Sequence, residues 1–134
     1  MKVLQISTVC GSGSVGRITV DIYHTLKSCG DEGLIAYGRR QAPEGVEAFR
    51  FGSDLDMGFH VLSTFFRGEH GFASTGQTRK LIEKIREWDP DVIHLHNIHG
   101  FILQVEELFS YLKQAGKPVV WTLHDCWPYT GHCA

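Results

Sequence analysis

The sequence predicts an α/β fold in which a parallel sheet is covered by helices on both faces. Two observations predict it: apolar runs of strand length alternate with segments of helical periodicity, and the strands are continuously apolar rather than alternating. The 134 residues suffice for one domain with a core. We expect this domain to be truncated, because the chain stops at Ala134 directly after a long loop, without a closing helix.

The first half of the chain is expected to contain three strands and one helix. The apolar segment 2–7 is predicted as a strand, and the glycine-rich segment 11–16 turns the chain toward a helix that starts at Arg17. This helix ends near Gly30, because glycine readily takes the left-handed conformation found after helices. The two further strands are predicted at residues 33–37 and 48–51.

The second half is expected to contain three helices and two strands. Residues 54–67 and 78–88 are predicted as helices, the second of which stops at Asp89 because a residue before proline avoids the helical region. The elements that follow are a strand, a helix and a strand, at residues 91–96, 104–115 and 118–123. The remaining segment, HDCWPYTGHCA, is expected to be a loop.

Three segments of unusual composition follow predicted strands. They are GSGSVGR at 11–17, HNIHG at 96–100 and HDCWPYTGHC at 124–133. Right-handed crossovers place the carboxyl ends of parallel strands along one edge of the sheet, which is where such sheets bind ligands. We therefore expect the three segments to meet in one crevice.

Composition and charge limit the classes of function. Thirteen basic and fifteen acidic residues give a net charge of −2, which argues against a dedicated nucleic-acid-binding protein. No apolar run reaches the roughly 20 residues of a membrane-spanning helix, and the N-terminus does not match a signal peptide. We therefore expect a cytoplasmic protein with reduced cysteines. One apolar cluster has two interpretations, a contact with a membrane surface or lipid-linked substrate and, more commonly, a place in the core: Phe59, Val61, Leu62, Phe65 and Phe66.

The segment GSGSVG has the spacing G-x-G-x-x-G between a predicted strand and a predicted helix. A helix N-terminus offers free N–H groups and a positive dipole end, so a phosphate-bearing ligand is the favoured interpretation. A dinucleotide site usually has an acidic residue after the second strand, but this chain has Gly38, Arg39 and Arg40 there. The arginines leave an NADP-dependent oxidoreductase as an alternative, and a tight turn without a ligand is another.

The histidines of HLHNIHG raise the possibility of a metal site. His94, His96 and His99 have the spacing of zinc hydrolases of the metallo-β-lactamase type, but Ile98 replaces the acid that this motif requires. The alternative is that His94 is hydrogen-bonded within the domain and only His96 and later residues are exposed. A second potential ligand set follows the last strand: His124, Cys126, His132 and Cys133.

Taken together, four segments resemble the N-terminal domain of bacterial glycosyltransferase family 4 enzymes. They are MKVLQISTVCGSGSVGRITVDIY, AYGRR, DPDVIHLHNIHGFIL and GKPVVWTLHDCWPYTGHCA. The most similar subgroup builds capsular and other surface polysaccharides. The resemblance implies the GT-B architecture, in which two Rossmann-like domains face each other across a cleft. It also implies transfer of a sugar from a nucleotide-sugar donor to a glycan or lipid-linked acceptor, with retention and without a catalytic metal.

The resemblance also implies roles for individual residues. The histidine of the strand-end T-x-H motif contacts the donor sugar near the reacting centre, and the match here is His124. The donor diphosphate or sugar is expected to contact the glycine loop, at Gly11, Gly13, Ser14, Gly16 and Arg17. The acceptor is expected to contact His96, Asn97, His99 and Asp125.

One departure from the family matters most: the second domain, which carries the E-x7-E donor motif, is absent from these 134 residues. Residues 1–134 are therefore expected to form only the acceptor-side domain, incomplete at its C-terminus. Half a cleft cannot hold both substrates in register, so we expect the chain alone to be inactive. An incomplete sheet leaves an unpaired edge, which predicts self-association. The expected location is the cytoplasm, extending to the inner face of the membrane.

Overall fold

The computed structural model describes residues 1–52, 75–99 and 102–130. Its centre is a sheet of five parallel strands in the order β3-β2-β1-β4-β5. The strands are β1 (Lys2–Val9), β2 (Glu32–Arg39), β3 (Ala48–Arg50), β4 (Val92–Leu95) and β5 (Val119–Trp121). This is the strand order of a Rossmann-like domain, and it confirms the predicted parallel α/β fold.

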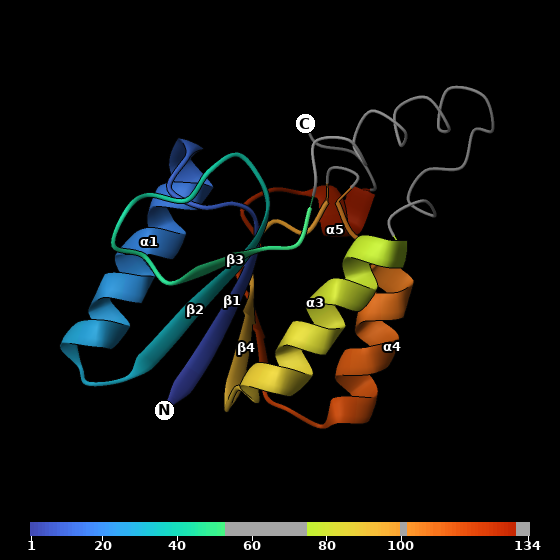
Figure 1. Ribbon diagram of the computed structural model, residues 1–134. Helices are drawn as coiled ribbons and strands as arrows, with labels where there is room; N and C mark the ends of the chain where they lie inside the picture. Colours follow the sequence, from blue (N-terminus) through green and yellow to red (C-terminus); the bar gives the residue numbers. More distant parts are fainter. Residues whose placement is uncertain (53–74, 100–101, 131–134) are drawn as a thin grey trace.

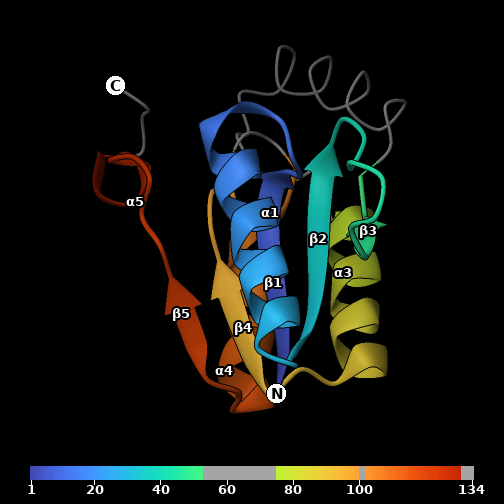
Figure 2. The same cartoon turned by 90° about the vertical axis from the view of Figure 1, so that its left-hand side faces the viewer.

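Helices cover both faces of the sheet, as the continuously apolar strands predict. Helix α1 lies on one face, and α3 and α4 lie side by side on the other (Figures 1 and 2). A one-turn helix, α5, stands beyond the carboxyl end of β5. The helices are α1 (Gly13–Ser28), α3 (Thr75–Trp88), α4 (Val105–Ala115) and α5 (Trp127–Thr130).

Two apolar clusters lie on opposite faces of the sheet. Leu4 and Ile6 are fully buried with the inward faces of α3 and α4. On the opposite face, Ile35 and Tyr37 of β2 pack against Tyr23 of α1. Each fully buried side chain of this size contributes roughly 1.5–3 kcal/mol to folding, so the larger cluster under α3 and α4 dominates the stability.

Two boundaries differ from the sequence expectation. Helix α1 starts at Gly13 rather than at Arg17, because the last glycine of the loop already belongs to its first turn. A Cβ on Gly16 would lie only 3.0 Å from the Gly11 nitrogen, so this turn requires a glycine. The expected loop after β5 contains the single helical turn α5. The other described elements agree with expectation within a few residues, and the helix predicted at 54–67 lies outside the described residues.

No helix in the described parts of the chain is long and apolar enough to cross a membrane. The apolar cluster considered above as a membrane contact lies within residues 53–74 and so outside the described residues.

Two glycine-to-alanine substitutions form a test of the packing. A Cβ on Gly52 would lie 2.3 Å from the carbonyl oxygen of Gly38, whereas a Cβ on Gly76, in the first turn of α3, meets nothing within 4 Å. We expect Gly52→Ala to lower the free energy of unfolding by about 1–3 kcal/mol, and Gly76→Ala to leave it unchanged or raise it by up to about 1 kcal/mol. Urea denaturation measures both, and an equal effect of the two substitutions would contradict the structure.

Candidate functional site

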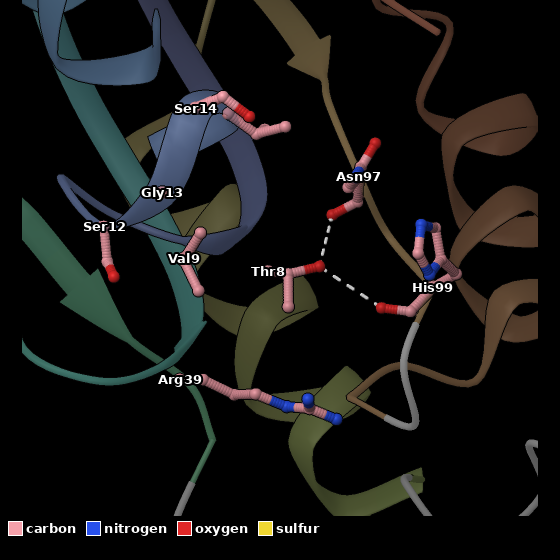
Figure 3. A pocket seen from close by; sticks show the side chains of 9 residues that line it. Thr8, Val9, Ser12, Gly13, Ser14, Arg39, Asn97 and His99 are labelled. Atoms are coloured by element: carbon pink, nitrogen blue, oxygen red, sulfur yellow. Dashed lines mark hydrogen bonds between the residues drawn. The ribbon is translucent and has the colours of Figure 1, made fainter. Parts of the chain in front are cut away.

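The candidate site is a cavity of about 270 Å³ at the carboxyl edge of the sheet. It lies between the chain that leaves β1 and the chain that leaves β4, where the strand order reverses and the two crossovers run in opposite directions. In open α/β sheets this switch point is the usual place for a ligand. The lining residues are Thr8, Val9, Ser12, Gly13, Ser14, Val15, Arg39, Asn97 and His99 (Figure 3).

Thr8 joins the two walls of this cavity. Its hydroxyl oxygen lies 2.8 Å from the carbonyl oxygen of Asn97 and 3.2 Å from that of His99 (Figure 3). Its amide also donates to the Asn97 carbonyl, at 2.8 Å. The segment after β4 is therefore held against the end of β1 through its backbone, and the side chains of Asn97 and His99, which take no part in this contact, line the cavity.

The three glycines of the GSGSVG segment have different structural roles. Gly11 has a φ of +71°, and a Cβ there would lie 2.4 Å from Pro43 Cγ. Gly16 is buried against Gly11, as described above. Gly13 has a φ of +67°, but its Cβ position faces open space beside the cavity. Gly11 and Gly16 therefore shape the loop, and Gly13 is the glycine that a ligand can approach.

The N-terminus of α1 is open to an anion. The side chain of its N-cap residue, Ser12, makes no capping hydrogen bond, and the first turn contains no acidic residue. In α4, by contrast, the Gln104 side chain accepts from the Glu107 amide, and two glutamates stand in the first turn. Free N–H groups and the positive end of the helix dipole at α1 favour a phosphate or carboxylate in the adjoining cavity.

Arg39 contributes positive charge to the same cavity. It ends β2, and Figure 3 shows its side chain extending below Thr8 toward the space between the two walls. Arg17, the predicted charge partner, lies on the exposed side of α1 and is not among the lining residues. The geometry thus indicates Arg39 as the cavity arginine, a residue that the sequence connected only with the NADP alternative.

Three of the residues expected to contact an acceptor form one hydrogen-bonded group. His99 Nε2 lies 2.7 Å from Asp125 Oδ2, and the other carboxylate oxygen accepts from the Trp127 amide at the start of α5. Desolvation acts to raise the pKa of Asp125, but hydrogen bonds from His99, Trp127 and Asn97 outweigh it, and the net pKa lies below its ordinary value. Asp125 is therefore a carboxylate at neutral pH, and it positions His99 and Asn97.

The fourth expected acceptor residue, His96, is buried. Its side chain is only 1% exposed, and it lies between Gln5 Oε1 at 3.1 Å and His124 Nε2 at 3.0 Å. Burial, reinforced by the neighbouring His94 and His124, lowers its pKa to about 3. The expectation that His96 is exposed at the strand end is therefore wrong, while its contact with the neighbouring His124 links it to the site.

The three histidines of the H-x-H-x-x-H pattern do not share a centre. His94 Nε2 bonds to the Thr122 hydroxyl at 2.8 Å, which confirms a hydrogen bond within the domain, while His96 and His99 have the separate partners given above. Within the described ranges, no three histidine, cysteine or acidic side chains are grouped to hold a metal ion. This arrangement does not support the zinc-hydrolase alternative. Of the second potential ligand set, His132 and Cys133 lie outside the described residues.

Among the residues that sequence reasoning missed, Gln5 and Thr8 make the hydrogen bonds that hold the site together. Gln5 is fully buried, and its amide nitrogen donates to the Thr19 carbonyl oxygen of α1 at 3.0 Å. A glutamine in the middle of the apolar run KVLQIS was the available signal, because a buried amide requires partners on both of its ends. Thr8 gave no such signal, since threonine is common at strand ends.

The fold and the place of the cavity define a Rossmann-like domain with its ligand site at the topological switch point. Comparison with known proteins gives the family. The model of Glycosyltransferase Family 4 matches residues 15–133, and the chain therefore belongs to this family.

One curated relative is WcaC of Escherichia coli (strain K12), whose name assigns it to glycosyl transfer in colanic acid biosynthesis. It is 38% identical over 50 residues, a segment that covers 34% of this chain and 12% of WcaC. A relative named for glycosyl transfer in colanic acid biosynthesis agrees with the polysaccharide-building subgroup that the sequence motifs resemble.

Two substitutions of Asp125 separate its roles. Asp125→Asn keeps an oxygen that can cap α5 but loses the charged bond to His99, whereas Asp125→Ala loses both. We expect the asparagine variant to lose about 1 kcal/mol of unfolding free energy and the alanine variant about 1 kcal/mol more. Urea denaturation at pH 7 measures the difference, and two variants as stable as the original chain would contradict the capping role.

Burial of His96 makes the stability depend on pH. Its pKa falls from an ordinary 6.5 to about 3 on folding, so the unfolded chain binds a proton that the folded chain does not. The stabilisation is complete above pH 6.5 and is lost as the pH falls toward 3, by about 1.4 kcal/mol per pH unit. We expect the slope of unfolding free energy between pH 6 and pH 4.5 to decrease by about that amount in His96→Gln.

The matched control for this slope is His24→Gln, which removes an exposed histidine of α1. It is expected to keep the original slope. An unchanged slope in His96→Gln would show that His96 is not the buried neutral group.

Proposed function

We propose that the chain is the acceptor-side half of a retaining GT-B glycosyltransferase. The complete enzyme transfers a sugar from a nucleotide-sugar donor to a glycan or lipid-linked acceptor in bacterial surface polysaccharide synthesis. The observation that carries the proposal is the cavity between the open N-terminus of α1 and the Asn97–His99 segment, in a domain of Glycosyltransferase Family 4. The name of WcaC supports the polysaccharide pathway class.

In this proposal the donor diphosphate lies against the first turn of α1. Gly13 and Ser14 line the cavity with N–H groups that the N-cap side chain leaves open, and Arg39 adds a positive charge. These groups suit the charge that develops on a leaving diphosphate. Gly11 and Gly16 act by shaping the loop, and Arg17 remains a predicted charge partner outside the cavity lining.

The acceptor is proposed to approach the opposite wall. Asn97 and His99 line that wall, and Asp125, which is hydrogen-bonded to both, lies with His124 in a second, smaller hollow at the end of β5. His124 takes the role of the histidine near the reacting centre. The proposed reaction uses no metal cofactor, as the family resemblance implies, and takes place in the cytoplasm at the inner face of the membrane.

Self-association is also part of the proposal. Strand β5 is an edge strand of the described sheet, and two of its apolar side chains, Val119 and Val120, are 40% and 51% exposed. Such an edge favours pairing with a second copy.

Binding of inorganic pyrophosphate and of UDP tests the donor site. We expect both to shift the backbone amide signals of Ser12–Val15 in NMR spectra, because these groups line the cavity. Arg39→Ala is expected to weaken binding about tenfold or more, as loss of a charged hydrogen bond does. Lys27→Ala removes an equal charge at the opposite end of α1 and is expected to change the affinity little. Equal losses in the two variants would indicate unspecific attraction and contradict the site.

The isolated chain is expected to show no measurable sugar transfer. In the GT-B architecture that the resemblance implies, this domain forms only one side of the cleft between the two domains, and transfer requires both substrates to be held in register. A turnover assay with radiolabelled nucleotide sugars and lipid-linked acceptors checks this. Clear multiple turnover by the 134 residues alone would overturn the assignment of a half-site.

A further inference from the structure

A continuous chain of hydrogen bonds runs through the sheet from α1 to His124. It starts at the backbone carbonyl oxygen of Thr19, passes through the side chains of Gln5 and His96, and ends at Nε2 of His124. The three distances are 3.0, 3.1 and 3.0 Å. Gln5 and His96 are inaccessible to solvent or nearly so, so water does not compete for these bonds.

The chemistry of the groups determines which atom donates and which accepts in each of these hydrogen bonds. A carbonyl oxygen only accepts, so the Gln5 amide nitrogen must be the group that faces Thr19, and its oxygen faces His96. An amide oxygen also only accepts, so the proton of His96 is on Nε2. If His96 is neutral, its Nδ1 carries a lone pair and must accept from Nε2 of His124.

The surroundings keep His96 neutral. Its ring is buried, the His94 ring lies 4.1 Å away between centroids, and the His124 ring is stacked at 5.3 Å. Desolvation and the two neighbouring imidazoles act in the same direction, and they lower its pKa to about 3. A protonated His96, which could donate from both nitrogens and reverse the last bond, is therefore excluded near neutral pH.

We propose that Gln5 and His96 are positioning residues that fix the tautomer of His124, with its proton on Nε2 and its lone pair on Nδ1. Among the residues that the structure describes, none hydrogen-bonds to this Nδ1. It is therefore a hydrogen-bond acceptor, suited to a hydroxyl group and unsuited to an anion. That the hydroxyl belongs to a sugar rests on the proposed function, while the tautomer does not.

His96 thus has a different role from the one that the family resemblance implies. The sequence resemblance predicts a direct contact between His96 and the acceptor, but the buried ring instead acts on the ligand through His124. It also connects α1 to the T-x-H motif, because Thr19 belongs to the helix whose N-terminus lines the cavity.

NMR spectroscopy of the imidazole nitrogens shows, without any substrate, which nitrogen carries the proton in the hydrogen bond between His96 and His124. We expect a scalar coupling across the hydrogen bond between His124 Nε2 and His96 Nδ1, with the proton bonded to His124. The ¹⁵N shift of His96 Nδ1 is expected to be that of an unprotonated nitrogen. A proton on His96 Nδ1 in the original chain would overturn the proposal, as would a missing coupling.

A pair of variants tests the role of Gln5. Gln5→Met keeps the size of the side chain but removes the acceptor, so His96 is expected to gain a population protonated on Nδ1, with a matching loss of the proton on His124 Nε2. Thr122→Val is the control, because it removes the hydrogen-bond partner of His94 but none of the hydrogen bonds that connect Thr19, Gln5, His96 and His124. It is expected to keep the original ¹⁵N pattern.

If Gln5→Met keeps the original pattern, Gln5 is not a positioning residue and the proposal fails. If Gln5→Met does not fold, the coupling direction in the original chain still decides the matter. A fixed tautomer together with no binding of pyrophosphate or UDP would refute the donor site alone, so the two proposals can fail separately.

Discussion

The pairing of β1 with β4 is the constraint on which the site depends. Val3 to Ile6 pair in parallel with Val92 to Leu95, across a chain separation of about ninety residues. The pairing continues past the strand ends, because the backbone amide of His96 donates to the carbonyl oxygen of Ile6, and the backbone amide of Thr8 donates to that of Asn97. Since the two crossovers then leave in opposite directions, the ends of β1 and β4 form a cavity instead of a closed surface.

The same pairing carries a polar path through an otherwise apolar sheet. Burying Gln5 and His96 without partners would cost several kcal/mol, since each unpaired polar group loses its contact with water. Both side chains instead have partners at each end. Such a path stabilises only one arrangement of α1, β1, β4 and the segment after β5, because a shift of any of them breaks a bond.

The sequence predicted those features that depend on local pattern. The continuously apolar strands gave the parallel sheet, and the positions of HNIHG and HDCWPYTGHC gave the edge at which Asn97, His99 and Asp125 meet. The start of α1 was not predicted because the glycine-rich segment contains no apolar residues at helical spacing. The burial of His96 goes with contacts to Gln5 of β1 and to Trp121 of β5, and the spacing of residues in the sequence does not predict such tertiary contacts. The sequence likewise did not predict that Arg39, and not Arg17, lines the cavity. Arg39 reaches it because β2 lies next to β1, which is a contact of the folded sheet.

This arrangement gives the two walls of the cavity different charges. The wall beside α1 carries the positive helix end and Arg39, with no acidic residue in the first turn. On the other wall, His99 is bonded to the carboxylate of Asp125, which together with His124 lines the smaller hollow beside the cavity. An anion is therefore attracted to the first wall and repelled by the second, whereas a hydroxyl group finds acceptors on the second. A ligand that carries an anionic group at one end and hydroxyl groups at the other can satisfy both walls in one orientation only.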